Sequence, residues 1–259
     1  MRRRLGIVVV LLHLLLASSC AVDGSAGYVS PRGDASPQRR KAANVQVSLA
    51  RGYMEQGRLE VALEKLKRAI TLDARSAPAY SMLGLLYERI NDPLLAEQNY
   101  RQAVLIDPTS GDMNNNLGGF LCRSGKAEES LQYFDKAVQD PFYGTPQAAL
   151  ANAGLCARSV HRSELAEGYF RRALQRDPNF PAALLPMAAI LHRNGEHLRA
   201  RAFAQRYEAA QGENAEFLAL AVEIEHALGD ERAASDYASR LLGRYPDSTE
   251  ARQLKEKQP

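Results

Sequence analysis

Residues 77–108 read APAYSMLGLLYERINDPLLAEQNYRQAVLIDP, and this stretch decides the fold. Proline donates no backbone hydrogen bond and restricts the residue before it, so Asp107-Pro108 ends a helix. The pattern returns when the stretch is shifted by 34 residues, which indicates a tandem array. Its apolar and small side chains recur at helical spacing: Tyr80, Leu83, Gly84, Tyr87, Ala96, Tyr100 and Ala103.

The repeat resembles the tetratricopeptide (TPR) motif in residue types and spacing. In that motif each unit is two antiparallel helices, with small residues where the helices cross closely and larger apolar residues beside them. No single unit can bury its own apolar face, so the units must stack. We therefore predict an all-α fold, a right-handed superhelical solenoid of six TPR repeats. The predicted repeats are residues 43–76, 77–110, 111–146, 147–180, 181–214 and 215–248, followed by a capping segment at 249–259.

The third repeat contains an unusual run, NNNLGGFLC, at residues 114–122. Asn and Gly are poor helix formers, yet the repeat pattern places this run in a helix. Gly118 falls at the small position where helices cross. Gly119 falls one position later, where the motif does not require glycine, and it leaves bare backbone beside Asn115. Close approach of a ligand and tight packing both explain such a glycine.

The chain begins MRRRLGIVVVLLHLLLASSC, which predicts a secretory signal. Arg2, Arg3 and Arg4 precede a short apolar run at residues 5–16. A single membrane-anchoring helix is the alternative, but the run is short for a membrane span. Residues 20–42 are rich in Gly, Ser, Ala and Pro and have no apolar period, so we predict a flexible tether there.

Residues Ala17-Ser18-Ser19-Cys20 resemble the lipobox of bacterial lipoproteins, although Ala17 stands where that pattern prefers Leu. The resemblance implies that residues 1–19 are removed and that Cys20 is lipidated. Ala21 follows the cysteine, where an Asp would signal retention in the inner membrane. We therefore expect a lipid-anchored protein of the outer membrane that faces the periplasm.

Charge and motifs argue against nucleic-acid binding and catalysis. Without the three arginines of the signal, 30 basic residues face 30 acidic ones, so nothing indicates nucleic acid as a partner. No zinc-protease, phosphate-loop or nucleophile-elbow motif occurs. Glu128 and Glu129 fit a solvated helix face, while His192 and His197 are five residues apart rather than the four that stack side chains on a helix. We predict no catalytic, cofactor-binding or metal-binding residues.

Two cysteines remain once Cys20 is lipidated. Cys122 and Cys156 lie 34 residues apart on the first helices of neighbouring repeats, so a disulfide is geometrically possible in an exported protein. The alternative is two buried thiols that act as small hydrophobic side chains.

A TPR solenoid offers an inner groove to a peptide or protein partner, either an amphipathic helix or an extended segment. Clamping of an acidic C-terminus needs Lys and Asn in the first repeat, where this chain has Val47 and Arg51, so that use is disfavoured. Asp112 and Cys122 also fall on the predicted inner face. For each candidate, ordinary solenoid surface is the alternative. The candidate partner-binding residues are Val47, Arg51, Met54, Ser81, Leu85, Glu88, Asn115 and Gly119.

Signal, lipobox, tether and repeats together resemble the PilF/PilW family of type IV pilus biogenesis lipoproteins. So do NNNLGGFLCRSGKAEESLQYFDKAVQDPFYGTP at 114–146 and ANAGLCARS at 151–159. The resemblance implies a non-enzymatic pilotin, monomeric when free, whose partner is the pilus secretin subunit. It would promote secretin localisation and multimerisation, or stabilise pili. A generic TPR lipoprotein scaffold for envelope or cell-wall assembly and an enzyme accessory subunit are the alternatives.

Overall fold

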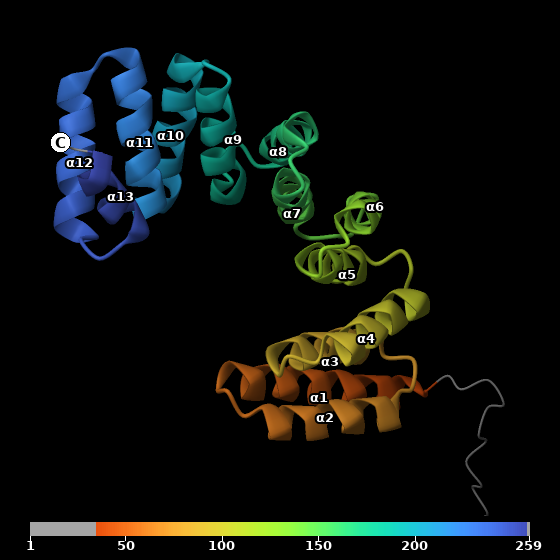
Figure 1. Ribbon diagram of the computed structural model, residues 1–259. Helices are drawn as coiled ribbons and strands as arrows, with labels where there is room; N and C mark the ends of the chain where they lie inside the picture. The colour runs from red at the N-terminus through yellow and green to blue at the C-terminus, as the bar shows by residue number, and fades with distance from the viewer. Residues whose placement is uncertain (1–34, 258–259) are drawn as a thin grey trace, which may run out of the picture. The chain divides into compact units, whose positions relative to one another are not determined.

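The computed structural model describes residues 35–257, and all regular structure in that range is α-helical. Figure 1 shows the helices following one another as antiparallel pairs. Predicted features in residues 1–34, including the signal and Cys20, lie outside the described residues. The helices are α1 (Pro37–Glu55), α2 (Leu59–Leu72), α3 (Ala77–Arg89), α4 (Pro93–Ile106), α5 (Gly111–Arg123), α6 (Ala127–Ala137), α7 (Pro146–Ser159), α8 (Ser163–Arg176), α9 (Pro181–Arg193), α10 (His197–Gln211), α11 (Ala215–Leu228), α12 (Glu231–Arg244) and α13 (Thr249–Lys257).

Each helix pair forms one TPR repeat, and its first helix also contacts the first helix of the next repeat. The described part of the chain is thus the expected α-solenoid of TPR repeats. The last helix, α13, packs against α11 and α12 and buries Ala251 completely. No helix within residues 35–257 has both the length and the apolar character needed to cross a bilayer.

The first helix begins earlier than the sequence pattern indicated. The predicted tether, residues 20–42, is wrong for residues 37–42, which form the start of α1. Ser36 caps this helix by accepting a hydrogen bond from the Arg39 backbone N–H at 3.4 Å, and Pro37 occupies the first turn. The Arg39 side chain also donates to the Thr71 carbonyl at 2.8 Å, which ties the first turn of α1 to α2.

Small side chains let the helices of a pair approach closely. A Cβ atom added to Gly118 would lie 3.0 Å from the Phe134 ring and 3.2 Å from the Ser130 carbonyl oxygen, both on α6. Larger residues would therefore push the pair apart. The poor helix propensity of NNNLGGFLC is tolerated because tertiary packing, not isolated helicity, stabilises this segment.

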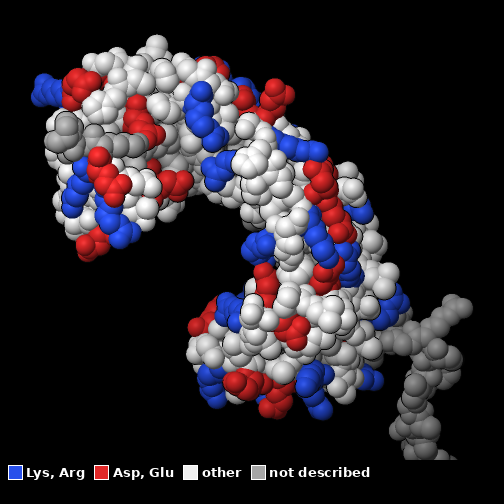
Figure 2. All heavy atoms as spheres, in the orientation of Figure 1, with Lys and Arg blue, Asp and Glu red and all other residues white. Residues whose placement is uncertain are grey.

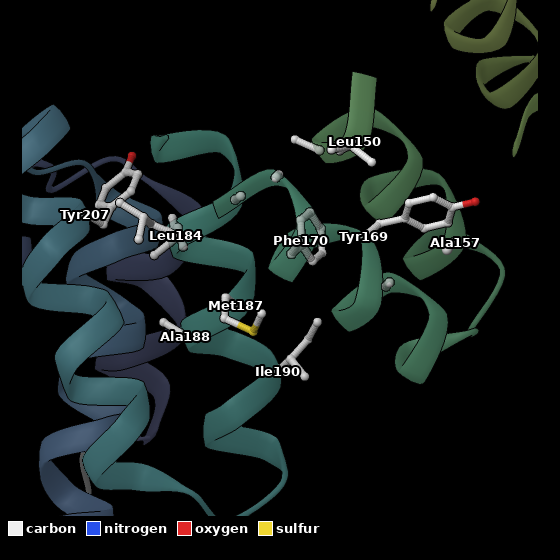
Figure 3. Close-up of a cluster of buried hydrophobic side chains, with 14 of the residues drawn as sticks. Leu150, Ala157, Tyr169, Phe170, Leu184, Met187, Ala188, Ile190 and Tyr207 are labelled. Carbon is white, nitrogen blue, oxygen red and sulfur yellow. The ribbon is translucent and has the colours of Figure 1, made fainter. Parts of the chain in front are cut away.

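The apolar core divides into several clusters along the array. One cluster runs through the second half of the chain, from Ala127 to Ala251, and Figure 3 shows Phe170, Leu184 and Met187 among its side chains. Another covers the first repeat and α3. Between them, where α4 meets α5, the buried clusters are small.

The two extra residues of the third repeat form part of the loop between α6 and α7. Asp140 organises this loop, because its carboxylate accepts from the Gly111 N–H at 2.7 Å and from the Phe142 N–H at 2.9 Å. Tyr143 is buried against Gly111. The insertion therefore closes over the start of α5 instead of breaking the stack.

Candidate functional site

The first helices of repeats one to four line a groove of about 660 Å³. Val47 and Arg51 show how a helix contributes to it, because residues four apart lie on the same face. Ser81 and Leu85 do the same on α3. Apart from Tyr100 of α4, every lining residue comes from a first helix. The lining is Val47, Arg51, Pro78, Ser81, Met82, Leu85, Tyr100, Asp112, Met113, Asn115, Asn116, Gly119, Arg123 and Asn152.

Most of the candidates inferred from the sequence lie in this lining: Val47, Arg51, Ser81, Leu85, Asn115 and Gly119. Met54 does not, and its prediction as a groove residue is wrong. Its side chain is 2% exposed and belongs to the core of the first repeat. Leu83 and Leu86 of α3 belong to the same core cluster, and the Arg89 side chain donates to the Met54 carbonyl at 2.7 Å.

Glu88 is also absent from the lining, so its role as a partner-binding residue stays a prediction. Its carboxylate instead binds Arg123 through two hydrogen bonds, of 2.7 Å from Nε and 3.0 Å from Nη2. It further accepts from the Tyr100 hydroxyl at 3.0 Å. Burial, with a contribution from Glu88, raises the pKa of Tyr100 above its usual value, so this hydroxyl stays protonated and donating.

Arg123 explains the groove-facing glycine. A Cβ atom on Gly119 would lie 3.2 Å from Nη1 of Arg123, because the guanidinium crosses bare backbone on its way to Glu88. The hydrogen bonds that Arg123 donates to the Glu88 carboxylate raise the pKa of Arg123. Arg123 therefore lines the groove with its charge already paired.

Side-chain amides link neighbouring helices on the groove lining. Asn152 of α7 donates from Nδ2 to the Asn115 Oδ1 atom at 3.1 Å. Asn116 of α5 donates from Nδ2 to the Ser81 hydroxyl of α3 at 3.0 Å. Asn116 and Asn152 were not among the residues predicted from the sequence, although Asn116 belongs to the unusual NNN run at 114–116.

Two charged side chains of the groove are exposed and form no ion pair within residues 35–257: Arg51 of α1 and Asp112 at the start of α5. Apolar side chains of Val47, Met82 and Leu85 lie in the same lining. Elsewhere, Figure 2 shows basic and acidic side chains interspersed on the visible face. The groove is thus mixed in character, with a cation beside apolar surface.

Cys122 and Cys156 are joined by a disulfide, with Cα atoms 5.8 Å apart. The bond links α5 to α7, the two helices that supply Asn115 and Asn152. Cys156 is completely buried, and its sulfur lies 3.0 Å from the Ser130 hydroxyl. The disulfide thus joins repeats three and four across the junction where the repeat length changes.

The structure brings His192 and His197 together, although their spacing of five residues does not stack them on one helix face. They lie on either side of the turn between α9 and α10, with their Nδ1 atoms 3.2 Å apart. Within residues 35–257 no group of three or more His, Cys, Asp or Glu side chains could hold a metal ion. Glu128 and Glu129 form surface ion pairs of 2.8 Å with Arg162 and Arg101.

Comparisons with known proteins agree with this architecture. Residues 50–91 match the TPR repeat family, and residues 77–110 and 152–215 match tetratricopeptide repeat families. The type IV pilus assembly protein PilF of Pseudomonas aeruginosa is 30% identical over 212 residues, which cover 82% of this chain and 84% of PilF.

Two solved structures are similar over most of the chain. The structure of Pseudomonas aeruginosa PilF has a TM-score of 0.78 at 29% identity and covers 85% of this chain and 100% of that one. The structure of PilW, a widely conserved type IV pilus biogenesis factor, has a TM-score of 0.73 at 32% identity and covers 82% of this chain and 98% of that one. The similarity therefore spans the repeats rather than a single motif.

Proposed function

Because this chain belongs to the PilF/PilW family of type IV pilus biogenesis TPR proteins, we propose that it is a non-catalytic assembly factor that binds the pilus secretin subunit. The binding site is the groove lined by α1, α3, α5 and α7. The lipid on Cys20 holds the protein at the periplasmic side of the outer membrane. Secretin carried in the groove is thereby brought to that membrane, where it multimerises.

The groove itself carries this proposal. It combines apolar surface at Leu85 with an unpaired cation at Arg51 and amide groups at Asn115, which together suit a polypeptide rather than a small metabolite. The disulfide and the amide hydrogen bonds hold its walls in place before a partner arrives. A preformed site loses less conformational entropy on binding.

Co-purification of the mature chain with the secretin subunit of the same source tests the binding role. We expect Leu85→Glu, which puts a charge on the apolar part of the groove, to weaken capture. Leu94→Glu is the matched control, because Leu94 is 68% exposed on α4 and lies outside the groove lining. Equal capture by both variants and the unmodified chain would count against the groove.

Removal of the lipid tests the delivery role separately. Cys20→Ala should leave the TPR fold and secretin binding intact, but it should mislocalise secretin or reduce its multimers in membrane fractions. Unchanged secretin rings would refute delivery. Failure of the unmodified chain to capture secretin at all would instead favour a general TPR lipoprotein scaffold for the cell envelope.

A further inference from the structure

We propose that the first repeat carries a second membrane contact: a basic face of α1 and α2 that lies on the anionic phospholipid headgroups of the bilayer. The basic face consists of Arg39 of α1 and of Lys65, Lys67 and Arg68 of α2. This contact rests on the proposed function in one respect, the lipid on Cys20, and it does not involve the groove.

Charge is distributed unevenly along the described part of the chain. Residues 35–76 contain nine Lys and Arg residues against four Asp and Glu residues, whereas residues 77–257 contain twenty against twenty-four. One of the four acidic residues, Asp73, is buried and accepts a hydrogen bond from the Arg75 backbone N–H at 3.0 Å. The balanced total therefore conceals a basic first repeat and a slightly acidic remainder. Such a separation of charge favours an anionic partner for the first repeat.

The side chains of the basic face are not neutralised within the protein. Arg39, Lys67 and Arg68 are exposed and form no ion pair within residues 35–257. Lys65 lies 3.7 Å from Glu64, its neighbour in the chain, and an ion pair with so exposed a carboxylate contributes little. In later repeats, by contrast, arginines bind carboxylates of neighbouring helices. The first repeat thus keeps its positive charge available to a partner.

The same side chains surround an open hollow between α1 and α2. Its volume is about 490 Å³, and Glu64 is the one acidic residue of its lining. Arg39 reaches the same place, because its guanidinium donates to the carbonyl of Thr71, which belongs to the lining, at 2.8 Å. Ammonium, guanidinium and amide donors therefore gather on one spot, and these are the groups that bind phosphate oxygens. The lining is Gln46, Glu64, Lys65, Lys67, Arg68 and Thr71.

The basic face lies at an open end of the array. Within residues 35–257, α1 contacts only α2 and α3, and α2 contacts only α1 and α3. The other end is covered by α13, which packs against α11 and α12. No helix of the described chain therefore covers the outer side of the first repeat, and a broad surface such as a bilayer can approach it.

The position of the face along the chain favours the bilayer as its partner. Fourteen residues separate Cys20 from Ala35, and a segment of that length spans at most about 50 Å in any conformation. Arg39 follows Ala35 by four residues. A lipid on Cys20 therefore keeps the basic face near the headgroups, where an anionic bilayer attracts Lys and Arg.

A lipid and a basic patch have different effects on a protein at a membrane, and together they hold it more firmly than either alone. The lipid on Cys20 limits the distance between the first repeat and the bilayer. A second contact, made by the folded repeat itself, also fixes the orientation of that repeat. The basic face would therefore determine how the first repeat meets the membrane.

Vesicle co-sedimentation of the mature chain with Cys20→Ala tests this contact in the absence of the lipid. The vesicles contain phosphatidylcholine alone, or phosphatidylcholine mixed with phosphatidylglycerol. We expect the chain to sediment with the mixed vesicles only, and high salt to release it. The mature chain has 30 basic and 30 acidic residues, so its net charge does not account for such binding.

Two double variants locate the contact on the protein. Lys67→Gln/Arg68→Gln should weaken binding to the mixed vesicles at least about tenfold, since each basic residue near an anionic surface contributes about fivefold. Arg176→Gln/Arg232→Gln is the matched control, because it removes the same charge from exposed arginines of α8 and α12 that form no ion pair within residues 35–257. Glutamine has a helix propensity close to that of Lys and Arg, so both variants should fold, which circular dichroism checks.

Three results would overturn the contact: no binding to the mixed vesicles, an equal loss in the two double variants, or normal binding by Lys67→Gln/Arg68→Gln. If that variant bound vesicles normally but lost secretin capture, the basic face would be a protein interface instead. Secretin capture by the unmodified chain separates this contact from the proposed function. Capture without vesicle binding removes the membrane contact alone, and vesicle binding without capture removes the secretin role alone.

Discussion

Arg123 lies across Gly119, one turn earlier on the same helix, and reaches Glu88 of the preceding repeat. A side chain at position 119 would occupy the path of the guanidinium, since a Cβ atom there comes within 3.2 Å of Nη1. The glycine therefore makes room for an ion pair between α3 and α5. Its bare backbone also lines the groove, so one residue serves both packing and access.

Gly119→Leu should block partner binding without unfolding the protein. The leucine would fill part of the groove and displace Arg123 from Glu88. We expect the free energy of unfolding to change by no more than about 1 kcal/mol, because loss of an exposed ion pair is offset by better helix propensity. Secretin capture should fall at least about tenfold. Circular dichroism checks the fold, and Gly168→Leu, at an open position on α8, should bind normally.

Gly111→Ala should destabilise the third repeat, where the loop between α6 and α7 closes over the start of α5. A Cβ atom at residue 111 would lie 2.5 Å from Cβ of Tyr143, which is a hard clash with a buried side chain. We expect a loss of about 1–3 kcal/mol in urea denaturation, as in other overpacked sites. Gly144→Ala has open space and should cost far less. If Tyr143→Ala did not diminish the effect of Gly111→Ala in a double-mutant cycle, the assigned contact would be wrong.

Loss of the disulfide should weaken the junction between repeats three and four. Cys122 and Cys156 close a loop across a sequence separation of 34 residues, and such a cross-link stabilises by about 2–4 kcal/mol. We expect Cys156→Ala to lower the stability of the oxidised protein by this amount. Dithiothreitol should destabilise the unmodified chain but not the variant. Non-reducing mass spectrometry of the mature protein checks the bond directly, and two free thiols would contradict it.

Acid should weaken the fifth repeat through His192. Burial, then the neighbouring His197, lower the pKa of His192 below its ordinary 6.5, while Glu223 acts in the opposite direction. The unfolded chain therefore binds this proton more tightly than the folded one. The contribution of neutral His192 to the free energy of unfolding is fully present above pH 6.5. It is lost as the pH falls through 6.5 toward the pKa of His192 in the folded state.

Thermal unfolding between about pH 8 and pH 5 measures this effect. The midpoint temperature of unfolding should decrease as the pH is lowered in the unmodified chain. It should decrease less in His192→Gln. His161→Asn is the control, because His161 is exposed and has a φ of 60°, a conformation that Asn tolerates. An identical pH profile for His192→Gln and the unmodified chain would show that this histidine does not carry the change.

Much of the fold could be predicted because the repeat is a local pattern. Gly84, Gly118 and Gly154 recur at the position where helices cross, and all lie against an aromatic ring of the second helix. The start of α1 was missed because Ser36 and Pro37 are capping residues within a stretch that otherwise has a tether composition. Composition averages over a segment, whereas a helix start depends on single side chains.

The groove could be located from the sequence only in part. Residues four apart, such as Ser81 and Leu85, follow directly from the helical period. Met54 and Glu88 were assigned by the same rule, but their exposure depends on α3 and α5, which are far away in sequence. Asn152 was overlooked because its significance lies in a hydrogen bond to a residue 37 positions earlier.

Helix order, repeat length and the closely crossing glycines follow from the sequence alone, because each is a property of nearby residues or of a regular period. Which side chains stay open in the groove was decided only by tertiary structure. Arg123 and Arg51 both lie on first helices of repeats. Of these two arginines, only Arg123 lies close enough to Glu88 to form an ion pair. Stacking of the repeats sets such pairings, since it brings together side chains that no local pattern connects.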